Sequence, residues 1–123
     1  MAATLNGRTL GDVVLIEPGA QIRTCADELP PLVTGYLDQR FGNFILNLHG
    51  VEHMDSSTLG GIALSHGLVS RRGGRFTLCC CVPRLVRLFH TTKLSGIFEV
   101  FDTEQEALES FDPDAPTRPA QPR

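Results

Sequence analysis

The sequence predicts an α/β fold, in which a four- to five-stranded, mostly parallel or mixed sheet is packed with about four helices. Three observations support this prediction. Short apolar runs of strand length alternate with longer segments of helical periodicity, the connections between them are short, and the central runs show little polar alternation. Strands without alternation are typical of a sheet covered on both faces, and short helical crossovers make neighbouring strands parallel.

The strand predictions rest on apolar runs that end at turn residues. The segment 13–16 reads VVLI, and Pro18 and Gly19 after it mark a turn. The segments 43–48 and 76–82 alternate little, so both are expected at the centre of the sheet. Two weaker strand predictions cover residues 97–101 and 4–8.

The longest predicted helix covers residues 25–40, where apolar side chains recur at spacings of three and four. These side chains are Leu29, Leu32, Val33, Tyr36 and Leu37. Because proline removes a backbone donor and is tolerated at the start of a helix, we expect Pro30 and Pro31 in its first turn.

Two further helices are predicted from their first residues. One begins at or near Ser56 and Ser57, within a run of side chains that cap helices, and ends before Gly73. The other begins at Pro83, because proline fits the first helical position, and ends near residues 91–93.

The last helix and the domain limits follow from the C-terminal part of the chain. Thr103 and Glu106 form a capping box, which predicts a helix over residues 104–111. Residues 1–111 therefore read as one domain. Residues 112–123 contain four prolines and no apolar periodicity, and we expect a disordered tail there.

Composition argues against several classes of function. The formal net charge is −3, and the only cluster of basic residues is Arg71, Arg72 and Arg75, so no nucleic acid is expected as a partner. The N-terminal residues lack the pattern of a secretory signal, and no run of about eighteen apolar residues is present. We expect no direct membrane insertion and a cytoplasmic location.

The four cysteines, Cys25, Cys79, Cys80 and Cys81, do not have the spacing of a disulfide framework or of a zinc site. Neighbouring residues on a strand point to opposite faces. We therefore interpret all four as ordinary buried thiols in a reducing compartment, and expect no metal and no cofactor.

The most informative local feature is the run Asp55-Ser56-Ser57-Thr58 between a buried strand and the start of a helix. Helix capping explains such residues. The same position also suits a functional site, because ligands and partners of α/β sheets bind beyond the carboxyl ends of the strands. Both interpretations can hold, since one hydroxyl can cap while its neighbour faces solvent.

An enzyme interpretation makes Ser57 the nucleophile of a small serine hydrolase, with one histidine as its base. The hydrolase elbow requires glycines two residues before and after the serine, where this chain has Asp55 and Leu59. A chain of this length is also too short to form a closed active-site pocket easily. The candidate bases are His49, His53, His66 and His90.

Several segments together resemble the STAS family, best known for bacterial anti-sigma factor antagonists. The resemblance covers residues 10–111. Its most specific part is the strand 44–48, followed by Val51, Met54, Asp55-Ser56-Ser57 and Leu59-Gly60. Supporting parts are Gly73-Gly74, residues 94–98 and Glu106-Ala107-Leu108.

The resemblance implies a STAS-like domain that acts by binding a protein partner, without catalysis. In the family, the second serine of this run is phosphorylated by an anti-sigma factor that is also a serine protein kinase, and a PP2C-like phosphatase reverses the reaction. By match this residue is Ser57, and phosphate there acts as an off switch. The partner-binding residues are then Asp55, Ser56, Ser57, Thr58, Leu59 and Arg23. The expected state is a monomer or weak dimer.

Two residues depart from the family pattern. Thr58 stands where glycine is frequent, which puts a branched side chain beside the phosphoacceptor and can restrict a kinase. Arg23 stands where an acidic residue is frequent, and can alter partner choice or bind phosphate. Because the strands before Arg23 and Asp55 should be neighbours, we expect Arg23 near the run Asp55 to Ser57.

An alternative within the same family is a scaffold subunit that is not phosphorylated, for example of a lipid-transport ATPase or of a sensory complex. The co-purifying partner distinguishes it from an antagonist. The hydrolase alternative requires turnover that is lost when Ser57 is changed.

Overall fold

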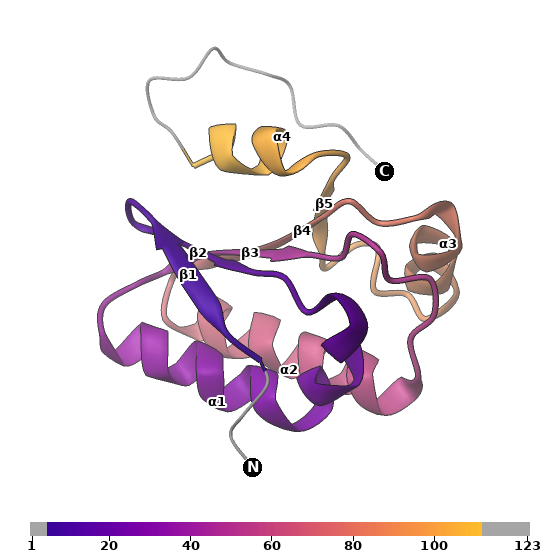
Figure 1. The fold of residues 1–123 in the computed structure, drawn as a ribbon, viewed down its shortest axis with the longest axis horizontal. Helices are drawn as coiled ribbons and strands as arrows, with labels where there is room; N and C mark the ends of the chain where they lie inside the picture. The colour runs from indigo at the N-terminus through magenta and orange to yellow at the C-terminus, as the bar shows by residue number, and fades with distance from the viewer. Residues whose placement is uncertain (1–4, 112–123) are drawn as a thin grey trace.

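A computed structural model describes residues 5–111 of the chain (Figure 1). The expected disordered tail, residues 112–123, and the first residue of the strand expected at 4–8 lie outside the described residues. In chain order the elements are β1 Gly7–Leu10, β2 Val13–Ile16, the 3₁₀ helix η1 Gly19–Thr24, α1 Cys25–Asp38, β3 Asn43–Asn47, α2 Ser56–Arg71, β4 Arg75–Cys79, α3 Pro83–Thr91, β5 Glu99–Phe101 and α4 Glu104–Glu109.

The five strands form one mixed sheet in the order β1-β2-β3-β4-β5, which confirms the predicted fold class. The pairs from β2 to β5 are parallel because a helix connects each strand to the next. Among the strands of residues 5–111, β1 alone is antiparallel to its neighbour. It is joined to β2 by the two-residue turn at Gly11 and Asp12, in which Gly11 has a φ of +63°.

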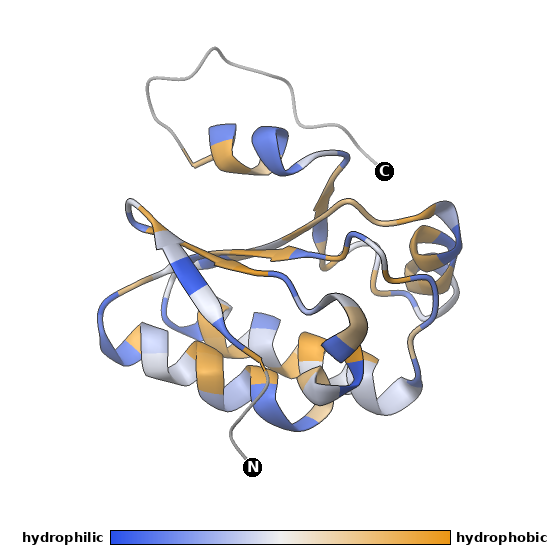
Figure 2. Ribbon diagram, viewed as in Figure 1, coloured by the Kyte–Doolittle hydropathy of each residue, from blue (hydrophilic) through white to orange (hydrophobic). Residues whose placement is uncertain are grey.

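The sheet has helices on both faces, as the lack of polar alternation predicts. In Figure 1, α1 and α2 lie on one face, α4 lies on the other, and α3 lies at one end of the sheet. Side chains of β3 divide between two apolar clusters: Phe44 and Leu46 pack toward α1 and α2, and Ile45 packs toward Ala107 of α4. The central strands β2, β3 and β4 are accordingly coloured as largely apolar in Figure 2, whereas the edge strand β1 is partly hydrophilic.

Helices α1 and α2 approach each other closely at Gly61. A Cβ atom on Gly61 would lie 2.2 Å from the carbonyl oxygen of Cys25 and 2.9 Å from the Cα of Ala26. Both of those atoms belong to the backbone, so they cannot move aside cheaply. The packing of α1 on α2 therefore requires glycine at this position.

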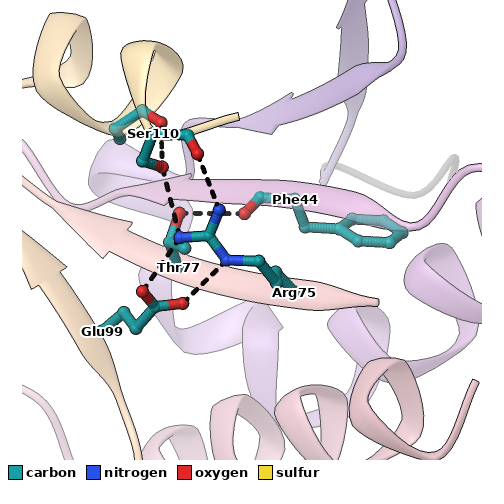
Figure 3. Close-up of polar contacts among 6 residues, drawn as sticks. Phe44, Arg75, Thr77, Glu99 and Ser110 are labelled. Carbon is teal, nitrogen blue, oxygen red and sulfur yellow. Dashed lines mark hydrogen bonds and ion pairs between the residues drawn. The ribbon is translucent and has the colours of Figure 1, made fainter. Parts of the chain in front are cut away.

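A polar network around Arg75 holds α4 against its side of the sheet (Figure 3). Its guanidinium forms two hydrogen bonds with the carboxylate of Glu99, at 3.0 and 2.9 Å, and donates to the carbonyl of Ser110 at 3.0 Å. It also lies 4.4 Å from the ring centroid of Phe111. One arginine of the basic cluster thus holds β4, β5 and the end of α4 together.

Several local predictions were wrong in their details. Pro30 and Pro31 lie in the second turn of α1, because the helix begins at Cys25 as predicted, which is already more than one turn before them. The strand predicted over 76–82 ends at Cys79, because Cys80 adopts a φ of +64° and turns the chain. The two edge strands span Gly7–Leu10 and Glu99–Phe101, where the sequence had predicted 4–8 and 97–101.

We predict that Gly61→Ala lowers the free energy of unfolding by about 1–3 kcal/mol, because the added methyl group overlaps the backbone of α1. Gly67→Ala is the matched control in the same helix. Apart from the neighbouring backbone of its own helix, no atom lies within 4 Å of the Cβ position of Gly67, so helix propensity should raise stability by up to about 1 kcal/mol. Urea unfolding measures both values, and equal stability of the two variants would contradict the close approach of α1 and α2.

Candidate functional site

The predicted site residues meet at the carboxyl ends of β2 and β3. The chain leaves β2 through Pro18 into η1, which carries Arg23, and leaves β3 through a loop that ends at Asp55. Because the two strands are parallel neighbours, both exits lie at one edge of the sheet. The Nε atom of Arg23 lies 3.8 Å from the Oδ2 atom of Asp55, as expected from the topology.

Asp55 is the N-cap of α2. Its backbone is extended, with φ −85° and ψ 172°, and its Oδ1 accepts a hydrogen bond of 2.8 Å from the N–H of Thr58. This hydrogen bond is the main reason that the pKa of the Asp55 carboxyl is held below its usual value, and the guanidinium of Arg23 adds to the effect. The cap fixes where α2 begins and therefore which residues occupy its first turn.

The first turn of α2 divides the predicted partner-binding residues into an exposed and a buried group. Ser56 and Ser57 are exposed. Thr58 and Leu59 are buried, with exposed fractions of 1% and 8%. The branched side chain of Thr58 is thus buried, and it directly follows the exposed Ser57 in the chain. Asp55, Ser56, Ser57 and Arg23 make up the solvent-facing part of the predicted set.

A groove of about 760 Å³ adjoins these residues, between η1, the loop that precedes α2, and α3. Ile22, Met54 and Leu88 contribute apolar walls, and Arg23 and Arg84 are the cations that line it. We call this cavity the η1–α3 groove. It gives the site a partly apolar concave surface beside the exposed serines.

A contact between Arg84 and His53 closes one side of this groove. The Nη1 atom of Arg84 lies 3.1 Å from Nδ1 and 3.0 Å from Nε2 of His53, so the guanidinium lies against the imidazole ring. This contact joins α3 to the loop before α2. The sequence predicts His53 only as a possible base and does not predict Arg84 as a site residue. The two residues are 31 positions apart and share no motif, so their contact could not be inferred.

The other histidines considered as bases have different surroundings. The ring of His66 packs against Phe76 and Phe98, with centroid distances of 6.4 and 5.7 Å. His49 and His90 are exposed. The two histidines with a described side-chain contact therefore contact groups other than Ser57.

Asn47 is a further residue that sequence reasoning missed. It is the last residue of β3 and is 5% exposed. Its carboxamide nitrogen donates to Glu104 of α4 at 2.8 Å, and its oxygen accepts from the N–H of His49 at 2.8 Å. Its position could have indicated this role: a polar side chain at the end of a buried strand needs hydrogen-bond partners nearby.

A sequence model of the STAS domain matches residues 9–107. The chain belongs to the STAS family. Among curated relatives, the anti-sigma F factor antagonist of Paenibacillus polymyxa is 33% identical over 66 residues, which is 54% of this chain and 56% of that protein. A homolog of TM1081 from Thermotoga neapolitana is 36% identical over 74 residues, 60% of this chain and 66% of that protein. The chain thus spans somewhat less than two thirds of these two relatives.

Solved structures of STAS proteins have the same fold as this chain. The NMR structure of the protein TM1081 superposes with a TM-score of 0.79 at 28% identity, over 89% of each chain. The phosphorylated form of the Bacillus cell fate determinant SpoIIAA superposes with a TM-score of 0.64 over 87% of this chain and 98% of that one. At 18% identity the second comparison concerns the fold alone. Within residues 5–111, no helix has the length and apolar character needed to cross a membrane.

We predict that Asp55→Ala lowers the Tm by a few degrees, because the N–H of Thr58 loses its acceptor, whereas Asp55→Asn retains a good cap and most of the stability. The pKa of Asp55 is lower in the folded chain than the usual 3.8, so its charge stabilises the fold above about pH 4, and this contribution disappears as the pH falls through the folded pKa. The Tm advantage of wild type over Asp55→Asn should therefore stay constant from about pH 7 to about pH 4 and shrink as the pH falls further in a series of calorimetric scans. An advantage that grows on acidification would contradict this assignment.

Proposed function

We propose that this chain is an anti-sigma factor antagonist that binds an anti-sigma factor with serine kinase activity and is switched off by phosphorylation of Ser57. The observation that carries the proposal is the exposed Ser57 in the first turn of α2, directly after the Asp55 cap. Membership of the STAS family supports it, as does the name of the Paenibacillus polymyxa relative. The function requires binding and no catalysis by this chain.

The physical basis of the switch is that the folded chain tolerates a negative charge on Ser57, whereas the interface with a partner does not. A phosphate on Ser57 adds about −1.5 to −2 charge at neutral pH. At the N-terminus of α2 this charge interacts favourably with the helix dipole, so the folded chain accepts it. A partner packed over the exposed serines has to remove water from the same charge, which is costly unless the partner supplies a cation.

The surroundings of Ser57 fit a surface for a protein partner. Asp55 and Arg23 put one charge of each sign at its rim, and the η1–α3 groove offers apolar walls next to it. Interfaces of proteins combine such an apolar centre with a polar rim. In the proposed cycle the chain acts in the cytoplasm as a monomer or weak dimer, and a PP2C-like phosphatase removes the phosphate.

We predict that Ser57→Asp weakens partner binding by a few orders of magnitude, because an unpaired buried charge costs several kcal/mol, while the Tm stays close to that of wild type. Ser57→Ala should bind normally and resist phosphorylation. Ser70→Asp is the matched control, since Ser70 is exposed near the other end of α2. The partner is first identified by pull-down and mass spectrometry, and titration calorimetry then measures its affinity for each variant and for the phosphorylated wild type. Equal affinities of the phosphorylated and unmodified chains would refute the switch.

We predict that Arg23→Asp changes partner affinity or the rate of Ser57 phosphorylation, because it replaces the cation beside Asp55 with a second negative charge. The stability should change little, since the Arg23–Asp55 pair is exposed and such pairs contribute about 1 kcal/mol or less. Arg72→Asp, at the far end of α2, makes the same change in net charge and should leave both quantities unchanged. Unaltered affinity and rate in Arg23→Asp would remove Arg23 from the site.

A further inference from the structure

Cys80 has a left-handed backbone conformation although it does not lie at the end of a helix. Three non-glycine residues within the described range 5–111 have positive φ: Arg40, Cys80 and Lys93. Arg40 and Lys93 each directly follow the C-cap of a helix, where a left-handed residue commonly ends the helix. Cys80 follows a strand, at a φ of +64°. Such strain persists only where the surrounding structure enforces it.

This conformation brings two neighbouring thiols to the same face of the sheet. Regular alternation would place Cys80 opposite Cys79, as the sequence led us to expect. Instead Cys79 and Cys80 both pack in the apolar cluster below α4, and Cys81 packs in the cluster on the side of α1 and α2. The Sγ atom of Cys80 donates a hydrogen bond to the Sγ atom of Cys79 over 3.7 Å.

We propose that Cys79 and Cys80 are a vicinal dithiol and form a modification site, which a hydroperoxide converts reversibly into a disulfide between adjacent residues. In the first step the thiol of Cys80 loses its proton and the resulting thiolate attacks the peroxide, the O–O bond breaks, and Cys80 becomes a sulfenic acid, while the other oxygen takes up the proton and leaves as water or an alcohol. In the second step the sulfur of Cys79 attacks that of Cys80, and the hydroxyl group leaves with the Cys79 proton as water. The two sulfurs lose two electrons in total, and the peroxide gains them.

Accessibility assigns the order of these two steps. Cys80 is half-buried and meets the oxidant first, whereas Cys79 has an exposed fraction of 0%. Burial raises the pKa of the Cys79 thiol, so it stays protonated and is not the group that the oxidant modifies first. Burial also raises the pKa of Cys25 and that of Cys81 to about 12. The sulfurs of Cys79 and Cys80 must then close from 3.7 Å to a bonded distance of about 2 Å.

The dithiol lies where three parts of the fold meet. The N–H of Cys80 donates to the carbonyl of Phe101 in β5 at 3.2 Å, and the carbonyl of Cys79 accepts from the N–H of Leu48 at 2.9 Å. Leu48 begins the loop that leads to Asp55. Oxidation therefore places a covalent ring at the junction of β4, β5 and the loop that carries the candidate site. This inference does not depend on phosphorylation of Ser57.

The test is treatment of the folded full chain with hydrogen peroxide, followed by denaturation and alkylation. We expect the number of alkylated cysteines to fall from four to two, and to return to four after reduction with dithiothreitol. Trypsin releases residues 76–84 as one peptide with all three neighbouring cysteines. Fragmentation of this peptide should locate an alkylated Cys81 and a disulfide between Cys79 and Cys80.

Single substitutions identify the pair. Cys80→Ser changes a half-buried residue and should abolish the disulfide, while Cys81→Ser, the matched control, should retain it. Cys79→Ala should also abolish it, and circular dichroism checks that each variant is folded. A disulfide that includes Cys81, a cross-link between chains, or overoxidation of Cys80 with a freely alkylated Cys79 would overturn the proposal.

Discussion

The parallel pairing of β2 with β3 is the constraint on which the positions of the candidate site residues depend. The register pairs Val13 with Asn43 and Ile16 with Leu46, and both strands are buried on their two faces. A slip by one residue would turn every one of these side chains to the wrong face of the sheet. The register is thus held by packing against helices on both sides, and the two chain exits that carry Arg23 and Asp55 stay at one edge.

Much of the fold could be predicted because local and long-range preferences agree. Leu29, Val33 and Leu37 have helical spacing and are buried in α1. Asp55 and Thr103 accept hydrogen bonds as N-caps of α2 and α4, where side chains of their type predict helix starts. At each of these positions the local sequence favours the same backbone conformation that the tertiary structure requires.

Other features depend on contacts that a local pattern does not contain. The end of β4 at Cys79 could not be predicted, because three cysteines and a valine give no turn signal and Cys80 is neither glycine nor asparagine. The position of Arg23 beside Asp55 is also a long-range contact, but it could be predicted, because the order of the strands alone brings the two residues together. The contact of His53 with Arg84 requires the position of α3 relative to the loop before α2, and no spacing in the sequence specifies that position.

The carboxamide of Asn47 links the loop before α2 with the helix on the opposite face of the sheet. One side chain donates to Glu104 of α4 and accepts from the N–H of His49, and it is almost completely buried. If α4 separates from the sheet, the carboxamide loses a partner at the place where it orients the loop. Separation of α4 therefore favours local opening of the loop as well. Hydrogen exchange at the N–H of His49 then reports, through Asn47, on the attachment of α4.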